Sequence, residues 1–203
     1  MNHKPKILSQ GSFDGACLLY ALMNAYKSFK GKSISSSVFA EEEKEVWKQV
    51  VNEVNSPKEI FNGNGSSSCF GENEVESTYR FVKKVVNMFE FDQILKVKRI
   101  LIKELLNIDF SNSIAILCYN ENGNIKSSLN GTEISDHWVC AIGFKQKSIC
   151  VQCSFTSQLS TSYRECKHDK SGRYYNQKIS IKQINPVNIA HEYIYLISRK
   201  NRL

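Results

Sequence analysis

The chain has 203 residues, of which 41% are hydrophobic and 23% charged, and its formal net charge is +7. This length and composition fit one globular domain, and no apolar run approaches the roughly 18 residues of a transmembrane helix. The lysines and arginines are spread along the chain instead of clustering with aromatic residues. Nucleic-acid binding is therefore not expected as the main function, and neither is membrane insertion.

The N-terminal residues lack the apolar core of a secretory signal peptide. We expect a cytoplasmic protein, or one that is delivered into another cell without a cleaved signal. The seven cysteines are an odd number, and several lie in apolar, strand-like runs. They are expected to be free, buried thiols and not a disulfide framework. The sequence predicts no oligomeric state.

The most informative stretch is 10–26, a polar turn with two glycines that leads into an apolar helix. Asp14 is a residue type that caps helix N-termini, which places Cys17 in the first turn. A buried face follows at helical spacing, made of Leu18, Leu22, Ala25, Tyr26 and Phe29. We expect the first turn itself to be open to solvent. There the positive end of the helix dipole favours a thiolate, so Cys17 is a candidate nucleophile.

Two further amphipathic helices are predicted, over 38–54 and 74–89. The apolar stripe of the first is Phe39, Val46, Trp47, Val50, Val51 and Val54, and that of the second is Tyr79, Val82, Val86 and Phe89. Residues 41–45 are expected to form a solvated acidic face. The glycine-containing loop at 62–68 lacks the following Lys-Ser/Thr of a phosphate-binding loop. Residues 94–106 fit either a strand or a short helix.

From Ser113 onward the sequence has the pattern of strands. A buried strand is predicted at 114–119, and a hairpin at 137–144 and 148–155. Closing strands are predicted at 179–181 and 191–197. Helices followed by mostly antiparallel strands define the α+β class. The expected organisation is one domain over 1–203 with a helical insertion at about 38–107.

Cys17 and His137 are the strongest candidates for chemistry. An imidazole can take the proton of a thiol and later protonate the leaving group, and the two residues need only be adjacent in space. The side-chain N–H of Gln10, together with the backbone N–H of Cys17, would stabilise a developing oxyanion. The alternatives are a buried structural cysteine, a strand-end histidine and an ordinary loop glutamine.

The segment Gln-Gly-Ser-x-x-Gly-x-Cys at 10–17 resembles the nucleophile segment of papain-like cysteine peptidases. His137, with Gly143 six residues later, resembles their histidine hairpin, including that of the bacteriocin-processing branch. Together with Asp14 and Trp138 the pattern is similar to uncharacterised bacterial papain-like proteins. The resemblance implies a papain-like fold whose N-terminal nucleophile helix packs on the sheet. It also implies no metal or other cofactor, with Asp14 and Trp138 supporting the site.

The sequence departs from the family at the residue that orients the imidazole. That residue is an Asn or Asp on the strand after the histidine, and without a gap its place falls on Cys153. A shift by one residue would bring in Gln152, which we favour, and Ser154 is a weaker acceptor. Asp136 is adjacent to the histidine but is expected to face the wrong way. Loss of the orienting residue lowers a rate without abolishing cysteine–histidine chemistry.

The expected function is a thiol hydrolase that acts on a peptide, an isopeptide or a glutamine side-chain amide through a thioester on Cys17. Its partner would be a protein or peptide substrate, and transfer to an amine is a variant of the same chemistry. The alternative is a catalytically impaired papain-like module that binds a protein, an interpretation motivated by Cys153. A structural zinc site would need Cys150, Cys153, Cys166 and His168, but cysteines three apart on a strand point to opposite faces.

Overall fold

The computed structural model describes residues 7, 16–30, 41–54, 74–89, 94–129, 131, 133–155, 167–169 and 171–199. The helices within these residues are α1 (Cys17–Lys30), α2 (Glu41–Asn52) and α4 (Glu74–Asn87), with the 3-10 helices η2 (Ile102–Asn107) and η4 (Ile181–Gln183). No helix in these ranges is both long and apolar enough to cross a membrane.

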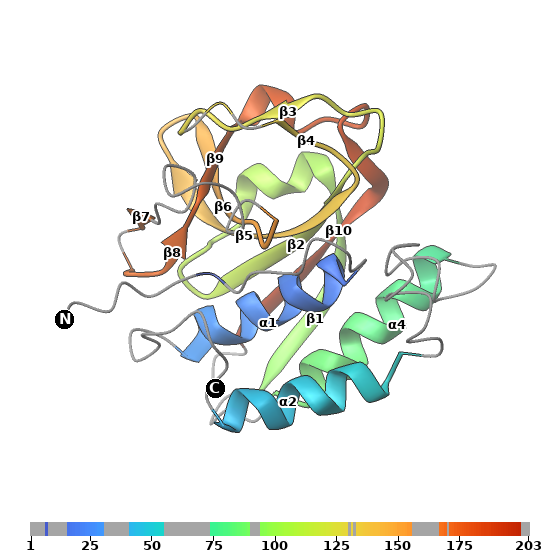
Figure 1. Ribbon diagram of the computed structural model, residues 1–203. Coiled ribbons are helices and arrows are strands. Elements are labelled where there is room, and N and C mark those ends of the chain that lie inside the picture. Colours follow the sequence, from blue (N-terminus) through green and yellow to red (C-terminus); the bar gives the residue numbers. More distant parts are fainter. Residues whose placement is uncertain are drawn as a thin grey trace.

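A six-stranded sheet runs in the order β1-β10-β2-β5-β6-β9, and all neighbouring strands in it are antiparallel. These strands are β1 (Leu95–Leu101), β2 (Ser113–Tyr119), β5 (His137–Lys145), β6 (Ser148–Gln152), β9 (Gln177–Ser180) and β10 (Ile189–Arg199). Two short pairs complete the described strands: β3 (Ile125–Lys126) with β4 (Glu133–Ile134), and β7 (Lys167–His168) with β8 (Tyr174–Tyr175). Helices α1, α2 and α4 cover one face of the sheet, and the 3-10 helices lie on the other (Figure 1). The predicted α+β class is confirmed.

The sheet separates two apolar cores because successive side chains of a strand point to opposite faces. On β5, Trp138, Cys140 and Ile142 belong to the cluster beneath the helices, here called the helix-side cluster. Val139 and Ala141 belong to the cluster on the other face, the far-side cluster. Every residue of β2 is buried, as expected for a central strand that is covered on both faces.

Helix α1 is buried on almost every side. All five residues of its predicted apolar face are at most 5% exposed, and Leu19, Met23, Asn24 and Lys27 are buried as well. Neighbours on both flanks explain this burial, since Tyr20 packs against Trp47 of α2 and Tyr26 against Phe89 after α4. Burial of each leucine contributes about 1.5–3 kcal/mol, so α1 is the main apolar anchor of the helix layer.

Two sequence-based expectations need correction, and one open alternative is resolved. The acidic face predicted at 41–45 is not fully solvated: Glu43 is buried and its carboxylate lies 3.5 Å from Lys27 Nζ. Residues 94–106, which fitted either a strand or a short helix, contain both, because β1 forms an edge of the main sheet and η2 follows it. The predicted strand at 148–155 ends at Gln152, since side-chain contacts replace the strand ladder beyond it.

Candidate active site

The first turn of α1 lies at the end of the sheet where β5 begins. The other end of α1 is fixed by two contacts: Ser28 Oγ donates to Gln152 Oε1 at 3.1 Å, and the guanidinium of Arg199 donates to the Phe29 carbonyl. Gln152 pairs with Cys140 in mid-sheet, and Arg199 with Leu95 at the opposite end. The 14 residues of α1 span about 20 Å. Since α1 packs along β5, its start reaches the level of the first residues of β5.

Cys17 occupies this first turn and is 8% exposed. It belongs to the helix-side cluster together with Trp138, the second residue of β5. The expectation of an open first turn was therefore wrong, because Ala16, Leu18 and Leu19 beside the thiol are buried too. A substrate carbonyl would have to reach the sulfur through the small exposed part of the residue.

His137 is the first residue of β5 and is 5% exposed. Its Nε2 lies 3.4 Å from Ser154 Oγ, and the Phe155 ring meets the imidazole edge-on with centroids 6.0 Å apart. Burial lowers the pKa of His137 to about 4. The imidazole is therefore neutral near pH 7, which is the protonation state that can accept a proton from a thiol.

The thiol and the imidazole start from opposite faces of the sheet. His137 pairs with Tyr119 and precedes Val139 by two residues on β5. Because alternate residues of a strand share a face, its side chain starts on the face of the far-side cluster. Cys17 lies on the face of Trp138. The structure contains no hydrogen bond between Cys17 and His137, both of which it describes. A working pair thus requires the imidazole to turn around the end of the sheet toward the thiol.

The candidates for the orienting residue are now separated in space. Gln152 Nε2 donates to Ser28 Oγ at 2.8 Å and to the Tyr174 carbonyl at 2.7 Å, so its amide holds α1 and β8 instead of His137. The side chain of Cys153 is fully buried in the far-side cluster. Ser154 is the candidate whose side chain meets the imidazole.

Asn176 holds this segment and was not singled out in the sequence. Its side chain is 1% exposed; Oδ1 accepts from the Cys153 N–H at 2.8 Å, and Nδ2 donates to the Cys153 carbonyl at 2.7 Å. Fixing the backbone at 153 positions Ser154 for its contact with His137. An asparagine in a polar stretch gives no sequence signal of this role, because the contact spans 23 residues.

A second histidine lies near Trp138 on the helix side. His191 has a φ of 57°, and β10 shifts its register against β2 between Ala190 and Tyr195. The Trp138 ring stacks on both His191 and Tyr195, at centroid distances of 6.2 and 5.8 Å. The indole Nε1 is buried and has no hydrogen-bond partner in the described structure. His191 and Tyr195 are four residues apart on β10, so the alternation of a strand places them on the same face of the sheet.

Some sequence predictions cannot be placed. Gln10 and Asp14 lie outside the described residues, so their oxyanion and capping roles stay predictions, and so does any contribution of Cys166 to a metal site. Cys150 belongs to the helix-side cluster and Cys153 to the far-side cluster, so these two cysteines do face opposite ways as expected. The described ranges hold no group of three His, Cys, Asp or Glu side chains arranged to bind a metal.

No family model and no curated protein matches the sequence. Among solved structures, the chain is similar to one from Bacillus anthracis that is described as a candidate C39-like peptidase. The match covers 100% of this chain and 96% of the other, with 14% identity and a TM-score of 0.44. At these values the likeness assigns neither a family nor an activity.

Proposed function

We propose that the protein is a papain-like thiol hydrolase with Cys17 as nucleophile and His137 as base. The observation that carries the proposal is that α1 begins with Cys17 at the end of the sheet where β5 begins with His137. The first turn of a helix favours the thiolate, and the buried neutral imidazole can take the proton. The resemblance of 10–17 to the nucleophile segment of papain-like peptidases supports the same assignment.

In the proposed reaction the Cys17 sulfur attacks an amide carbonyl while His137 takes the thiol proton. The resulting oxyanion is stabilised by the Cys17 backbone N–H and the Gln10 side chain. His137 then protonates the departing amine, which leaves a thioester on Cys17. Water attacks the thioester, His137 accepts its proton, and the thiol and a carboxylic acid are released. Peptide hydrolysis and glutamine deamidation differ here only in whether an amine or ammonia leaves.

Ser154 takes the place of the orienting residue in this proposal. Its hydroxyl donates to His137 Nε2 when the imidazole carries its proton on Nδ1, or accepts in the other tautomer. A hydroxyl holds the ring less firmly than a carboxylate, which carries a full negative charge. We therefore expect a slower enzyme than one with an Asp at this position.

A second candidate function is a catalytically impaired module that binds a protein. The burial of Cys17 and the missing bond between its thiol and His137 favour it. This candidate and the hydrolase make opposite predictions about the reactivity of Cys17.

Alkylation by iodoacetamide at neutral pH, followed by peptide mass mapping, separates the two. Cys118 is a matched internal control, since it is 6% exposed against 8% for Cys17. A hydrolase predicts that Cys17 reacts at least tenfold faster than Cys118 and that His137→Gln removes this advantage. The same substitution at the exposed His168 is the matched control variant. Equal rates for the two cysteines would refute the hydrolase.

A further inference from the structure

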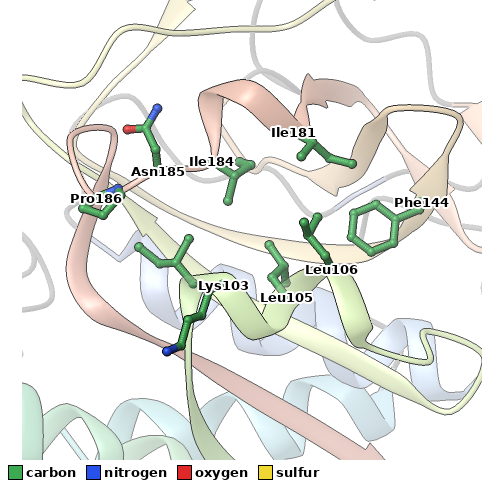
Figure 2. Close-up of a pocket in the computed structure, with 9 residues that line it drawn as sticks. Lys103, Leu105, Leu106, Phe144, Ile181, Ile184, Asn185 and Pro186 are labelled. Carbon is green, nitrogen blue, oxygen red and sulfur yellow. The ribbon is translucent and has the colours of Figure 1, made fainter.

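A separate cavity of about 250 Å³ opens on the face of the sheet opposite α1. Its lining is mainly apolar and comes from η2, β5, η4 and the residue after η4: Ile102, Leu105, Leu106, Phe144, Ile181 and Ile184 (Figure 2). The sheet separates the cavity from Cys17, so nothing in the proposed hydrolase accounts for it. The volume lies just below the roughly 300–1,000 Å³ of pockets for drug-sized molecules, which suits one short chain or ring.

The walls of this cavity are held by contacts that do not involve a ligand. Leu105 is 1% exposed, and Phe144 packs edge-on against Phe110 with centroids 5.2 Å apart. Asn185 uses its own amide to fix the loop after η4, because Nδ2 donates to the Lys182 carbonyl and Oδ1 accepts from the Val187 N–H. The cavity is therefore preformed, which lowers the conformational cost of filling it.

One lysine lines the cavity, and two more are neighbours of lining residues. Lys103 lies on η2, Lys182 lies on η4 between two lining isoleucines, and the Lys147 carbonyl accepts from the Ile181 N–H at 3.1 Å. All three side chains are exposed, and none forms an ion pair within the described structure. Figure 2 shows the Lys103 ammonium turned outward from the apolar lining, as expected for a charged group at a rim.

Negative charge at the mouth is weak by comparison. Glu104 is the acidic residue on η2, and η4 has none. The Glu104 carboxylate accepts from the Leu101 N–H at 2.7 Å, so it caps its own 3-10 helix. An apolar cavity with cations at its entrance complements a molecule with an alkyl chain and an anionic end.

We propose that this cavity binds a medium-chain fatty acid anion, with its alkyl chain between η2 and η4 and its carboxylate among Lys103, Lys147 and Lys182. Lysines act as mobile point charges, which suits a single anionic group at the end of a flexible chain. A protein partner fits less well, since a stable protein interface buries about 1,200–2,000 Å² and needs a broad surface. Leu106, which is 54% exposed at the rim, would cover the part of the chain nearest the carboxylate.

Titration of the full chain with decanoate below its micelle concentration tests the proposal, with binding followed by calorimetry and by amide NMR shifts. The expected shifts cluster on η2, η4 and Phe144. Affinity is expected to rise about fourfold per added methylene from hexanoate until the cavity is full. Decanol should bind more weakly than decanoate, and decyltrimethylammonium more weakly still.

Two variants test separately how the alkyl chain and the carboxylate of decanoate are bound. Leu106→Trp fills the mouth from an exposed position and should reduce decanoate binding at least tenfold, with an unchanged melting temperature as the check on folding. Lys103→Glu combined with Lys182→Glu should weaken decanoate binding while leaving decanol unaffected. Lys48→Glu, on α2 across the sheet, is the control for a change of lysine to glutamate away from the cavity.

Three results would overturn the proposal: no binding of decanoate, equal affinities for decanoate and decanol, or shifts confined to the face of α1. Cys17→Ala should leave decanoate binding unchanged. Failure of the hydrolase and failure of the fatty-acid site would therefore be recognised independently.

Discussion

The two faces of the sheet are built from the same strands but differ in what covers them. Three α-helices among the described residues cover the helix-side face, and α1 is buried there almost all round. The far-side face is covered by short 3-10 helices that leave a cavity and an exposed leucine. The tightly covered face carries the candidate nucleophile, and the loosely covered face carries the candidate ligand cavity. Continuous helix packing restricts chemistry to the end of the sheet, whereas short covering elements leave room within the face.

The largest expected difference between the faces is in the free energy of unfolding that is lost when a buried leucine is replaced by alanine. Leu22 on α1 and Leu105 on η2 are 0% and 1% exposed, so they form a matched pair. We expect Leu22→Ala to lower the free energy of unfolding by about 3–5 kcal/mol, because helices and sheet surround it. Leu105→Ala should cost about 2–3 kcal/mol, since Leu105 already borders empty space and η2 can move inward.

Urea unfolding of both variants, followed by circular dichroism, measures this difference. Equal losses would show that the far-side face is packed as firmly as the helix side, and would contradict the comparison. Decanoate should raise the stability of the wild-type protein in the same assay, because a ligand that binds only the folded state stabilises it.

Lowering the pH tests the burial of His137, which lies at the end of the sheet where the two faces meet. The folded pKa of His137 is about 4, below its ordinary value of 6.5, because burial disfavours the imidazolium. Between these values the unfolded chain binds a proton that the folded protein does not. The free energy of unfolding should therefore fall by about 3 kcal/mol as the pH drops from about 6.5 to 4, and stay unaffected by this group above 6.5.

Chemical denaturation at a series of pH values checks this dependence. In His137→Gln the fall in unfolding free energy between pH 6.5 and 4 that is due to this imidazole should vanish. His168→Gln, an exposed control, should retain it. An unchanged acid profile in the His137 variant would mean that the imidazole is more solvated than its 5% exposure indicates.

The smallest expected effect concerns the turn between β5 and β6. Gln146 has a φ of 58°, a region that asparagine tolerates better than glutamine. Gln146→Asn should raise the free energy of unfolding by about 0.5–1 kcal/mol, despite the loss of an exposed contact with Lys178. Lys147→Asn, at the next position of the same turn, should bring no such gain. Thermal melts of the two variants measure this difference in stability.

The sequence predicted the regular parts of the fold well. All five residues that the period of α1 assigned to its apolar face are buried. The hairpin of β5 and β6 was predicted with its turn, although β6 ends three residues earlier than predicted. These features depend on local periodicity, which a single sequence displays. The strand β1 remained ambiguous because an edge strand with alternating lysines lacks a continuous apolar run.

The parts that were missed depend on contacts between distant residues. Cys17 is buried in the cluster that contains Trp138, and Glu43 is buried beside Lys27. The choice among Gln152, Cys153 and Ser154 depends on where β6 ends, which the sequence alone placed three residues too late. A side chain at a strand end changes face with a shift of one residue, so periodicity could not settle which of them meets His137.

The side-chain amide of Asn176 holds the backbone at position 153. It donates to the Cys153 carbonyl and accepts from the Cys153 N–H, as a neighbouring strand would. These contacts hold the backbone at 153 without involving its side chain. Asn176 thus fixes the position of Ser154 through the backbone, independently of the side chain at 153.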